Sequence, residues 1–204
     1  MTKKLLIIIP GSETRLIPLF RSISSKFYSY FGVNNDNSDW PFKLKDSIDE
    51  YIDTMIFEWQ GGISNIFSLT PASKKLTNLI KKHQDYDEII LFGKSLGGVV
   101  AEKTIKKSGV RNISKLIYVA TPHSSNKKRF PKNIKAINIY SNQDRCQELA
   151  NKLLYFGFGK RTLSNAQNIC IDNLNHSDFK INKPVNIDGE KINLFEYYSK
   201  LAGN

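Results

Sequence analysis

The chain has 204 residues, of which 40% are hydrophobic, so it is long enough for one well-buried domain and short for two. No apolar stretch approaches the roughly 20 residues that a membrane-spanning helix needs. Residues 102–204 carry +10 of the net charge of +11, yet they contain no recognisable nucleic-acid-binding motif, so nucleic acid is not an expected partner. A lysine-rich solvated face is the favoured explanation, with weak contact to an anionic membrane surface as the alternative.

The first predicted strand is the apolar run 5–9. Basic residues precede it, as in a signal peptide, but the run is only five residues long, lacks a small-residue cleavage site and ends at Pro10-Gly11. We therefore expect a buried strand and a cytoplasmic protein. Cys146 and Cys170 are too few for a disulfide framework, so two buried free thiols are expected and a single bridge is the alternative.

Apolar runs alternate with helical patterns along the whole chain. The predicted strands are residues 5–9, 54–59, 88–92, 115–120, 135–140 and 166–171. The predicted helices are residues 15–30, 71–83, 96–107, 147–156 and 194–201, with a short helical turn at 48–51. Residues 31–47 form a polar surface excursion that could serve as a lid. This alternation predicts an α/β fold in which a mostly parallel sheet of about six strands carries helices on both faces, in a single domain over residues 1–204.

The most specific motif is Gly93-Lys94-Ser95-Leu96-Gly97, which joins the strand at 88–92 to the next helix. In a strand–turn–helix context, Gly-x-Ser-x-Gly is typical of a nucleophilic serine on a strained turn. Gly93 and Gly97 leave room for the turn. The backbone N–H of Leu96, near the helix N-terminus, is aimed at a developing oxyanion. The alternative is a glycine-rich turn with a solvated serine.

A serine nucleophile needs a base, and the chain offers three histidines. His83 precedes a strand, which places it at the edge of a parallel sheet opposite the serine. His123 and His176 each follow a strand and are expected at the catalytic edge. His176 is the predicted base, and His123 is the alternative.

Asp144 follows the strand at 135–140 and is the predicted acid that orients the imidazole. The chain order Ser95, Asp144, His176 is that of α/β-hydrolases. A turn-capping role is the alternative for Asp144. The alternative acids are Asp172 and Asp178, although both are close to His176 along the chain.

A second oxyanion donor usually comes from the loop after the first core strand. Here Gly11 permits a tight turn, and the N–H of Ser12 is the predicted donor. An ordinary strand-ending turn is the alternative.

With these motifs, residues 3–204 resemble the α/β-hydrolase superfamily, with lipase- and carboxylesterase-like members the nearest in pattern. The segments that resemble family motifs are the serine turn, residues 120–123, the Asp144 turn and residues 175–179. The resemblance implies a three-layer α/β-hydrolase sandwich and catalysis through an acyl-enzyme, without a metal or an organic cofactor.

By the same resemblance, Ser95 is the nucleophile, His176 the general base and then acid, and Asp144 the orienting acid. Ser12 and Leu96 would form the oxyanion hole through their backbone amides. Two departures stand out. Pro10-Gly11 replaces the His-Gly of many members, and the stretch 121–135 is too short for a cap domain, so little or no cap is expected.

The expected function is therefore a carboxylesterase or lipase-like serine hydrolase that acts on a small-molecule or lipid ester. An acyl-thioesterase or an acyltransferase with the same triad is the alternative within this chemistry. A non-catalytic basic module that docks on anionic membrane surfaces is the alternative from another class.

Overall fold

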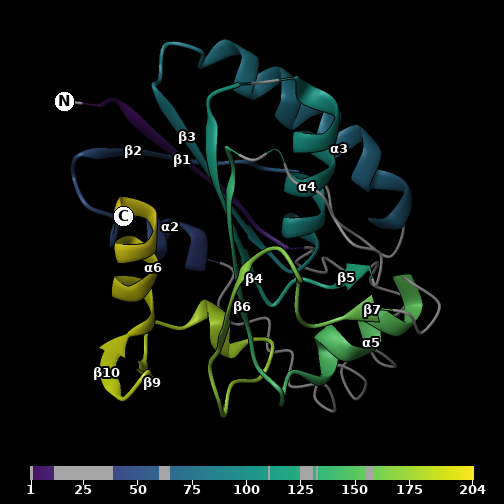
Figure 1. Cartoon of the computed structure of the whole chain (residues 1–204), viewed down its shortest axis with the longest axis vertical. Helices are drawn as coiled ribbons and strands as arrows, with labels where there is room; N and C mark the ends of the chain where they lie inside the picture. Colours follow the sequence, from purple (N-terminus) through teal and green to yellow (C-terminus); the bar gives the residue numbers. More distant parts are fainter. Residues whose placement is uncertain are drawn as a thin grey trace.

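The computed structural model describes residues 2–11, 39–59, 65–109, 111–124, 131, 133–154 and 159–204. Six strands form one sheet in the order β2-β1-β3-β4-β6-β8, and every neighbouring pair in it is parallel (Figure 1). These strands are β1 (Lys4–Ile9), β2 (Ile52–Ile56), β3 (Glu88–Lys94), β4 (Ile113–Val119), β6 (Lys135–Tyr140) and β8 (Gln167–Cys170). The α/β fold expected from the sequence is confirmed.

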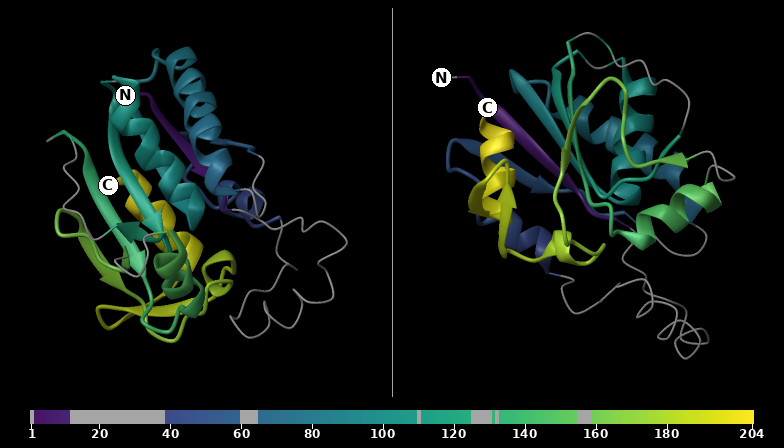
Figure 2. Two further views of the ribbon diagram at one scale, coloured as in Figure 1. Left: turned by 90° about the vertical axis from the view of Figure 1, so that its right-hand side faces the viewer. Right: turned by 60° about the horizontal axis from the view of Figure 1, so that its bottom comes forward.

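Helices cover both faces of this sheet. They are α2 (Trp40–Lys45), α3 (Asn65–Lys82), α4 (Leu96–Ser108), α5 (Arg145–Leu154), α6 (Leu194–Gly203) and the 3-10 turn η2 (Asp178–Lys180). Figure 2 shows α3 and α4 together on one side of the sheet and α6 on the other. No helix among the described residues is long and apolar enough to cross a membrane.

Side chains of the central strands alternate between two cores, because successive residues of a strand point to opposite faces. On β1, Ile7 and Ile9 join the core under α3 and α4, whereas Leu6 and Ile8 join the core under α2 and α6. Phe92 of β3 belongs to the second core. Burial of each such side chain contributes roughly 1.5–3 kcal/mol, so the central strands form a rigid base for the loops at their ends.

The sheet order reverses at β1, which has β2 on one side and β3 on the other. In open α/β sheets, ligands bind at such a reversal, outside the carboxyl ends of the strands. The chain leaves β1 through Pro10 and Gly11, and it leaves β3 at Ser95. The topology therefore places the serine turn at the position where this fold binds its ligands.

The residues expected as a surface excursion contribute to the core. Within the described part of residues 31–47, α2 buries Trp40 and Leu44 completely. The Trp40 ring lies 6.5 Å from the ring of Phe92. Residues 31–38, and the helix expected at 15–30, lie outside the described residues.

Helix α3 begins at Asn65, six residues before the expected start at Pro71, so that expectation was wrong. Proline lacks an N–H and usually ends a helix. Here Pro71 is exposed, while Leu69, Leu76 and Ile80 continue the buried face across it. Packing of that face outweighs the loss of one backbone hydrogen bond.

The hairpin of β9 (Pro184–Ile187) and β10 (Glu190–Asn193) was not predicted. Its turn is Asp188-Gly189, with φ of 53° and 87°. An Asp-Gly pair between two alternating runs is a strong hairpin signal, so the sequence did contain the information. A second short pairing joins β5 (His123–Ser124) to β7 (Gly159–Lys160), and neither strand was predicted.

Gly97 allows the first turn of α4 to lie against the end of β1. A Cβ at this position would be 2.1 Å from the carbonyl oxygen of Ile9 and 2.6 Å from that of Pro10. Because both atoms belong to the backbone, Gly97→Ala is expected to destabilise the fold by about 3 kcal/mol or more.

Urea unfolding of Gly97→Ala tests this expectation, with Gly109→Ala as the control. Gly109 caps α4 at a φ of 60°, and nothing lies near a Cβ built there, so alanine is expected to cost only about 1 kcal/mol. Equal losses in the two variants would contradict the close approach at Gly97.

Candidate active site

Ser95 occupies a sharp turn between β3 and α4. Its φ of 51° and ψ of −126° lie in a region that residues with a side chain rarely adopt, a strain of about 1–3 kcal/mol. The Ser95 N–H donates to the carbonyl of Val119 at 2.8 Å, and its own carbonyl accepts the Gly98 N–H at 3.1 Å. These bonds to β4 and α4 hold the strained turn in place.

Glycines on both sides of the serine allow the turn to close. A Cβ at Gly93 would lie 2.4 Å from the Cα of Gly98, so no larger residue fits there without movement. Leu96 is the first residue of α4, and the first N–H groups of a helix have no partner within it. The turn at Ser95 therefore has the strained strand-to-helix geometry expected from the sequence, and the role of the Leu96 N–H as an oxyanion donor stays a prediction.

The loop after β1 packs directly against the serine. A Cβ at Gly11 would lie 2.9 Å from the Cβ of Ser95 and 3.6 Å from its Oγ. Glycine is needed here because two chain segments approach closely. Ser12, the predicted second oxyanion donor, lies outside the described residues, and its role stays a prediction.

Asp144 and His176 are brought together at the carboxyl edge of the sheet, past β6 and β8. His176 Nδ1 lies 2.8 Å from Asp144 Oδ2. The Asp144 side chain is fully buried, and that of His176 is 8% exposed. A hydrogen bond from Nδ1–H to the carboxylate leaves Nε2 with its lone pair, which is the tautomer that a general base requires.

Asp144 also caps helix α5. Its Oδ1 accepts the backbone N–H of Gln147 at 2.8 Å, three residues further along the chain. This is the N-cap hydrogen bond, and the Asp-x-x-Gln spacing resembles a capping box. The capping role and the pairing with His176 were alternatives in the sequence; the structure gives each role to a different carboxylate oxygen.

The buried surroundings fix the charges of this pair. Burial alone would raise the pKa of Asp144, but the charge and hydrogen bond of His176, the Gln147 N–H and the charge of Lys94 together lower that pKa below 3.8. Burial lowers the pKa of His176 below 6.5, Lys94 and Lys180 lower it further, and Asp144 opposes them. At neutral pH, Asp144 is therefore a carboxylate and His176 is neutral.

Two further residues hold the Asp144 loop, and sequence reasoning missed both. Gln147 Nε2 donates to the carbonyl of Thr121 at 2.7 Å, which links the first turn of α5 to the loop after β4. Arg161 Nη2 donates to the Asp144 carbonyl at 3.0 Å. The capping-box spacing could have drawn attention to Gln147, whereas Arg161 acts from a distant loop and has no local signal.

Lys94 was also missed as a group that acts on the site. It lies between Gly93 and Ser95, and only 4% of it is exposed. Its charge lowers the pKa of both Asp144 and His176. A lysine at the end of a buried strand is an unusual choice, and this was the available signal.

The alternative bases have other partners. His123 is fully buried, its Nε2 lies 2.8 Å from Asn138 Oδ1, and its ring packs edge-on against Tyr118. His83 packs against Tyr86 just before β3, at the opposite edge of the sheet, as expected.

The alternative acids are likewise held elsewhere. Asp178 accepts the backbone N–H of Asn175 at 2.7 Å and pairs with Lys183 at 3.0 Å. Asp172 accepts a weak bond from the thiol of Cys170, at a distance of 3.7 Å. Of these three carboxylates, Asp144 is the one bonded to the imidazole of His176.

Both cysteines are free, so the single bridge kept as an alternative is wrong. Cys170 is exposed, so the expectation that both thiols are buried was wrong as well. Burial, with the nearby charge of Asp144, raises the pKa of Cys146 to about 12, which makes it a poor nucleophile. Among the described residues, no group of three or more His, Cys, Asp and Glu side chains is arranged to hold a metal ion.

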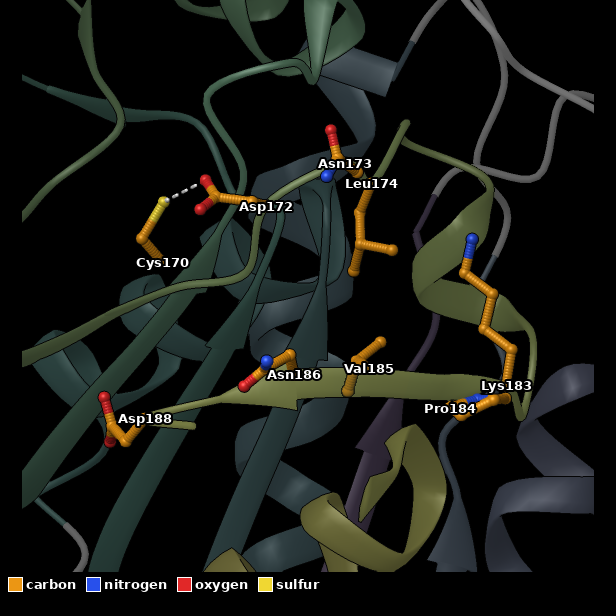
Figure 3. A pocket seen from close by; sticks show the side chains of 9 residues that line it. All are labelled: Cys170, Asp172, Asn173, Leu174, Lys183, Pro184, Val185, Asn186 and Asp188. Atoms are coloured by element: carbon orange, nitrogen blue, oxygen red, sulfur yellow. Dashed lines mark hydrogen bonds between the residues drawn. The ribbon is translucent and has the colours of Figure 1, made fainter. Parts of the chain in front are cut away.

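A groove of about 720 Å³ lies beside the segment that leads to His176 (Figure 3). Leu174 and Val185 face each other across it, and carboxylates stand at Asp172 and Asp188. None of the three candidate catalytic residues, Ser95, Asp144 and His176, lines this groove. The groove is therefore separate from the candidate catalytic groups.

A model of the alpha/beta hydrolase family matches residues 66–188. Among solved structures, ClbQ from the colibactin NRPS/PKS pathway is 12% identical, with a TM-score of 0.51 over 99% of this chain and 95% of that one. MGS-MChE2, an alpha/beta hydrolase enzyme from a sediment metagenome of the Mar Chica lagoon in Morocco, is 16% identical, with a TM-score of 0.47 over 87% and 84%.

The RedJ thioesterase of the prodiginine pathway in Streptomyces coelicolor is 11% identical, with a TM-score of 0.38 over 61% of this chain. The match spans only 45% of the length of RedJ. A comparison with the curated proteins finds no match. The likeness to ClbQ extends over the whole chain and concerns the fold alone.

Proposed function

Because the chain belongs to the alpha/beta hydrolase family, we propose that it is a serine hydrolase that cleaves carboxylic esters. Ser95 is the nucleophile, His176 the general base and then acid, and Asp144 the orienting acid. The observation that carries the proposal is the buried 2.8 Å contact between His176 Nδ1 and Asp144 Oδ2, at the same edge of the sheet as the strained turn of Ser95.

The proposed reaction has two halves. Ser95 Oγ attacks the ester carbonyl carbon while His176 Nε2 takes the hydroxyl proton, and the resulting imidazolium is stabilised by the Asp144 carboxylate. The negative charge that develops on the carbonyl oxygen is stabilised by hydrogen bonds from the backbone N–H groups of Leu96 and Ser12. The imidazolium then gives its proton to the departing alkoxide, which leaves an acyl-enzyme. A water molecule, deprotonated by His176, then attacks the carbonyl carbon of the acyl-enzyme. His176 returns the proton to Ser95 Oγ as the carboxylic acid is released.

The pH dependence of this reaction follows from the lowered pKa of His176. Below that pKa the imidazole is protonated and has no lone pair for the serine proton, so kcat/KM falls as the pH falls through it. We expect an acid limb with its inflection below 6.5. Asp144 stays ionised throughout, because its pKa lies below 3.8. A profile of kcat/KM from about pH 4.5 to 8 measures the inflection.

Lys94→Met is the matched variant for this profile. It removes a charge that lowers the pKa of His176, so the inflection is expected to move to higher pH. An inflection above 6.5 in the unaltered protein, or a move to lower pH in Lys94→Met, would contradict the assignment of His176 as the base.

Hydrolysis of p-nitrophenyl esters of increasing acyl length tests the proposed activity. Each ester is compared with its thioester analogue, and an added alcohol measures partition of the acyl group to a second acceptor. The proposal predicts turnover of esters with release of the free acid. Turnover of thioesters alone, or transfer mainly to the alcohol, would assign the same triad to a thioesterase or an acyltransferase.

A further inference from the structure

We propose that Trp59 is a positioning residue that holds the Pro10–Gly11 peptide against the nucleophile. Its indole Nε1–H donates to the Pro10 carbonyl at 2.8 Å. Trp59 follows β2, the neighbour of β1, so the bond ties together the two chain segments that leave these strands. The inference rests on the proposed function, because it assigns Trp59 a task in catalysis at Ser95.

The held peptide lies between Trp59 and the serine turn. Gly97 of α4 approaches the Pro10 carbonyl so closely that a Cβ would be 2.6 Å from its oxygen. On the other side, Gly11 is in contact with Ser95. The peptide is therefore bounded by α4, by the nucleophile and by the indole. Among the described residues, the indole of Trp59 is the side chain that holds this peptide through a hydrogen bond.

A peptide unit is planar, so an anchor on one of its atoms orients the rest. With the Pro10 oxygen fixed, the direction of the Gly11 N–H is fixed as well. Gly11 immediately precedes Ser12, the proposed source of the second oxyanion donor. Donors of this kind act through preorganisation, and a displacement of about 1 Å near reacting atoms can cost on the order of 100-fold in rate.

The rest of the Trp59 side chain anchors the donor. The indole is half-buried and packs on the edge of the core under α3 and α4. Phenylalanine keeps an aromatic ring in this packing and removes the N–H donor together with the five-membered part of the indole. Loss of Trp59 is therefore expected to change the rate of the chemical step more than substrate binding. The loop that Trp59 holds is the proposed source of a hydrogen bond to a negative charge that develops only in the transition state.

The test compares Trp59→Phe with Tyr86→Phe. Tyr86 donates from its hydroxyl to Asp53 at 2.8 Å just before β3, so the control also removes one aromatic donor, but at the opposite edge of the sheet. We expect Trp59→Phe to lower kcat about tenfold with KM changed less than twofold. It should weaken the binding of a trifluoromethyl ketone, which forms a hemiketal oxyanion on the serine, by a similar factor. Tyr86→Phe should change neither value.

A measurement on the unaltered protein keeps the test independent of how the variant folds. Hydrogen exchange of the Trp59 indole N–H should be slowed at least tenfold relative to free indole, as expected for a bonded donor. Exchange at the free rate would overturn the inference, and so would a rise in KM with kcat unchanged, or equal losses in both variants. If the unaltered protein is active and Trp59→Phe is equally active, the role of Trp59 is overturned and the proposed function stands. Unaltered protein without turnover overturns the proposed function and this inference with it.

Discussion

Replacing Ser95 with alanine is expected to lower kcat by about a millionfold, to the level of the reaction without an activated nucleophile. The change removes one oxygen atom and leaves the backbone of the turn in place, because alanine and serine both carry a Cβ at the same strained φ of 51°. Steady-state hydrolysis of the best ester, with thermal unfolding as a check on the fold, measures the effect.

Ser95→Gly is the matched control for the strain at this position. Glycine adopts the observed φ and ψ at little cost, so this variant should be as inactive as Ser95→Ala and more stable by about 1–3 kcal/mol. A Ser95→Ala variant that retains more than about a thousandth of the activity would contradict covalent catalysis by Ser95.

Replacing Asp144 with asparagine is expected to lower kcat about 10⁴-fold. An asparagine amide can donate to Nδ1, which favours the imidazole tautomer with its proton on Nε2 and so removes the base. Asparagine is as good an N-cap as aspartate, so the bond to the Gln147 N–H is kept and α5 should be unaffected. The kinetic loss therefore reports the pairing with His176 rather than helix stability.

Asp178→Asn is the matched control for the acid. Asp178 was an alternative acid, and it pairs with Lys183 and the Asn175 backbone. Its replacement is expected to change kcat less than about threefold. A large loss in Asp178→Asn with little change in Asp144→Asn would contradict the assignment of Asp144. Measurement of kcat for both variants at neutral pH decides between them.

The parts of the site that could be predicted from the sequence are those with a local or ordered signal. The motif from Gly93 to Gly97 follows an apolar run and precedes a helical pattern, so both its local structure and its place at the sheet edge follow from neighbouring residues. Asp144 and His176 could be paired because each follows a strand, and parallel strands end at one edge. Chain order then selected His176 over His123, and Asp172 was set aside because it is close to His176 along the chain.

What could not be predicted depends on contacts between distant segments. The bond from Trp59 to Pro10 joins residues 49 positions apart, and neither residue type indicates the other. The extent of α3 was missed because Pro71 normally signals a helix start, whereas packing on the opposite face decided its position. The burial of Trp40 was missed because the stretch before it, residues 34–39, is polar, and its ring partner Phe92 lies far along the chain on β3.

Labelling with a fluorophosphonate, followed by peptide mass spectrometry, tests whether Ser95 is a nucleophile activated by His176, because this reagent reacts with activated serine hydroxyls and spares ordinary ones. The unaltered protein is compared with His176→Ala. A single adduct on Ser95 is expected, and it should disappear in His176→Ala. Absence of an adduct on the unaltered protein, or an adduct on another residue, would contradict the assignment of Ser95 and His176 as nucleophile and base.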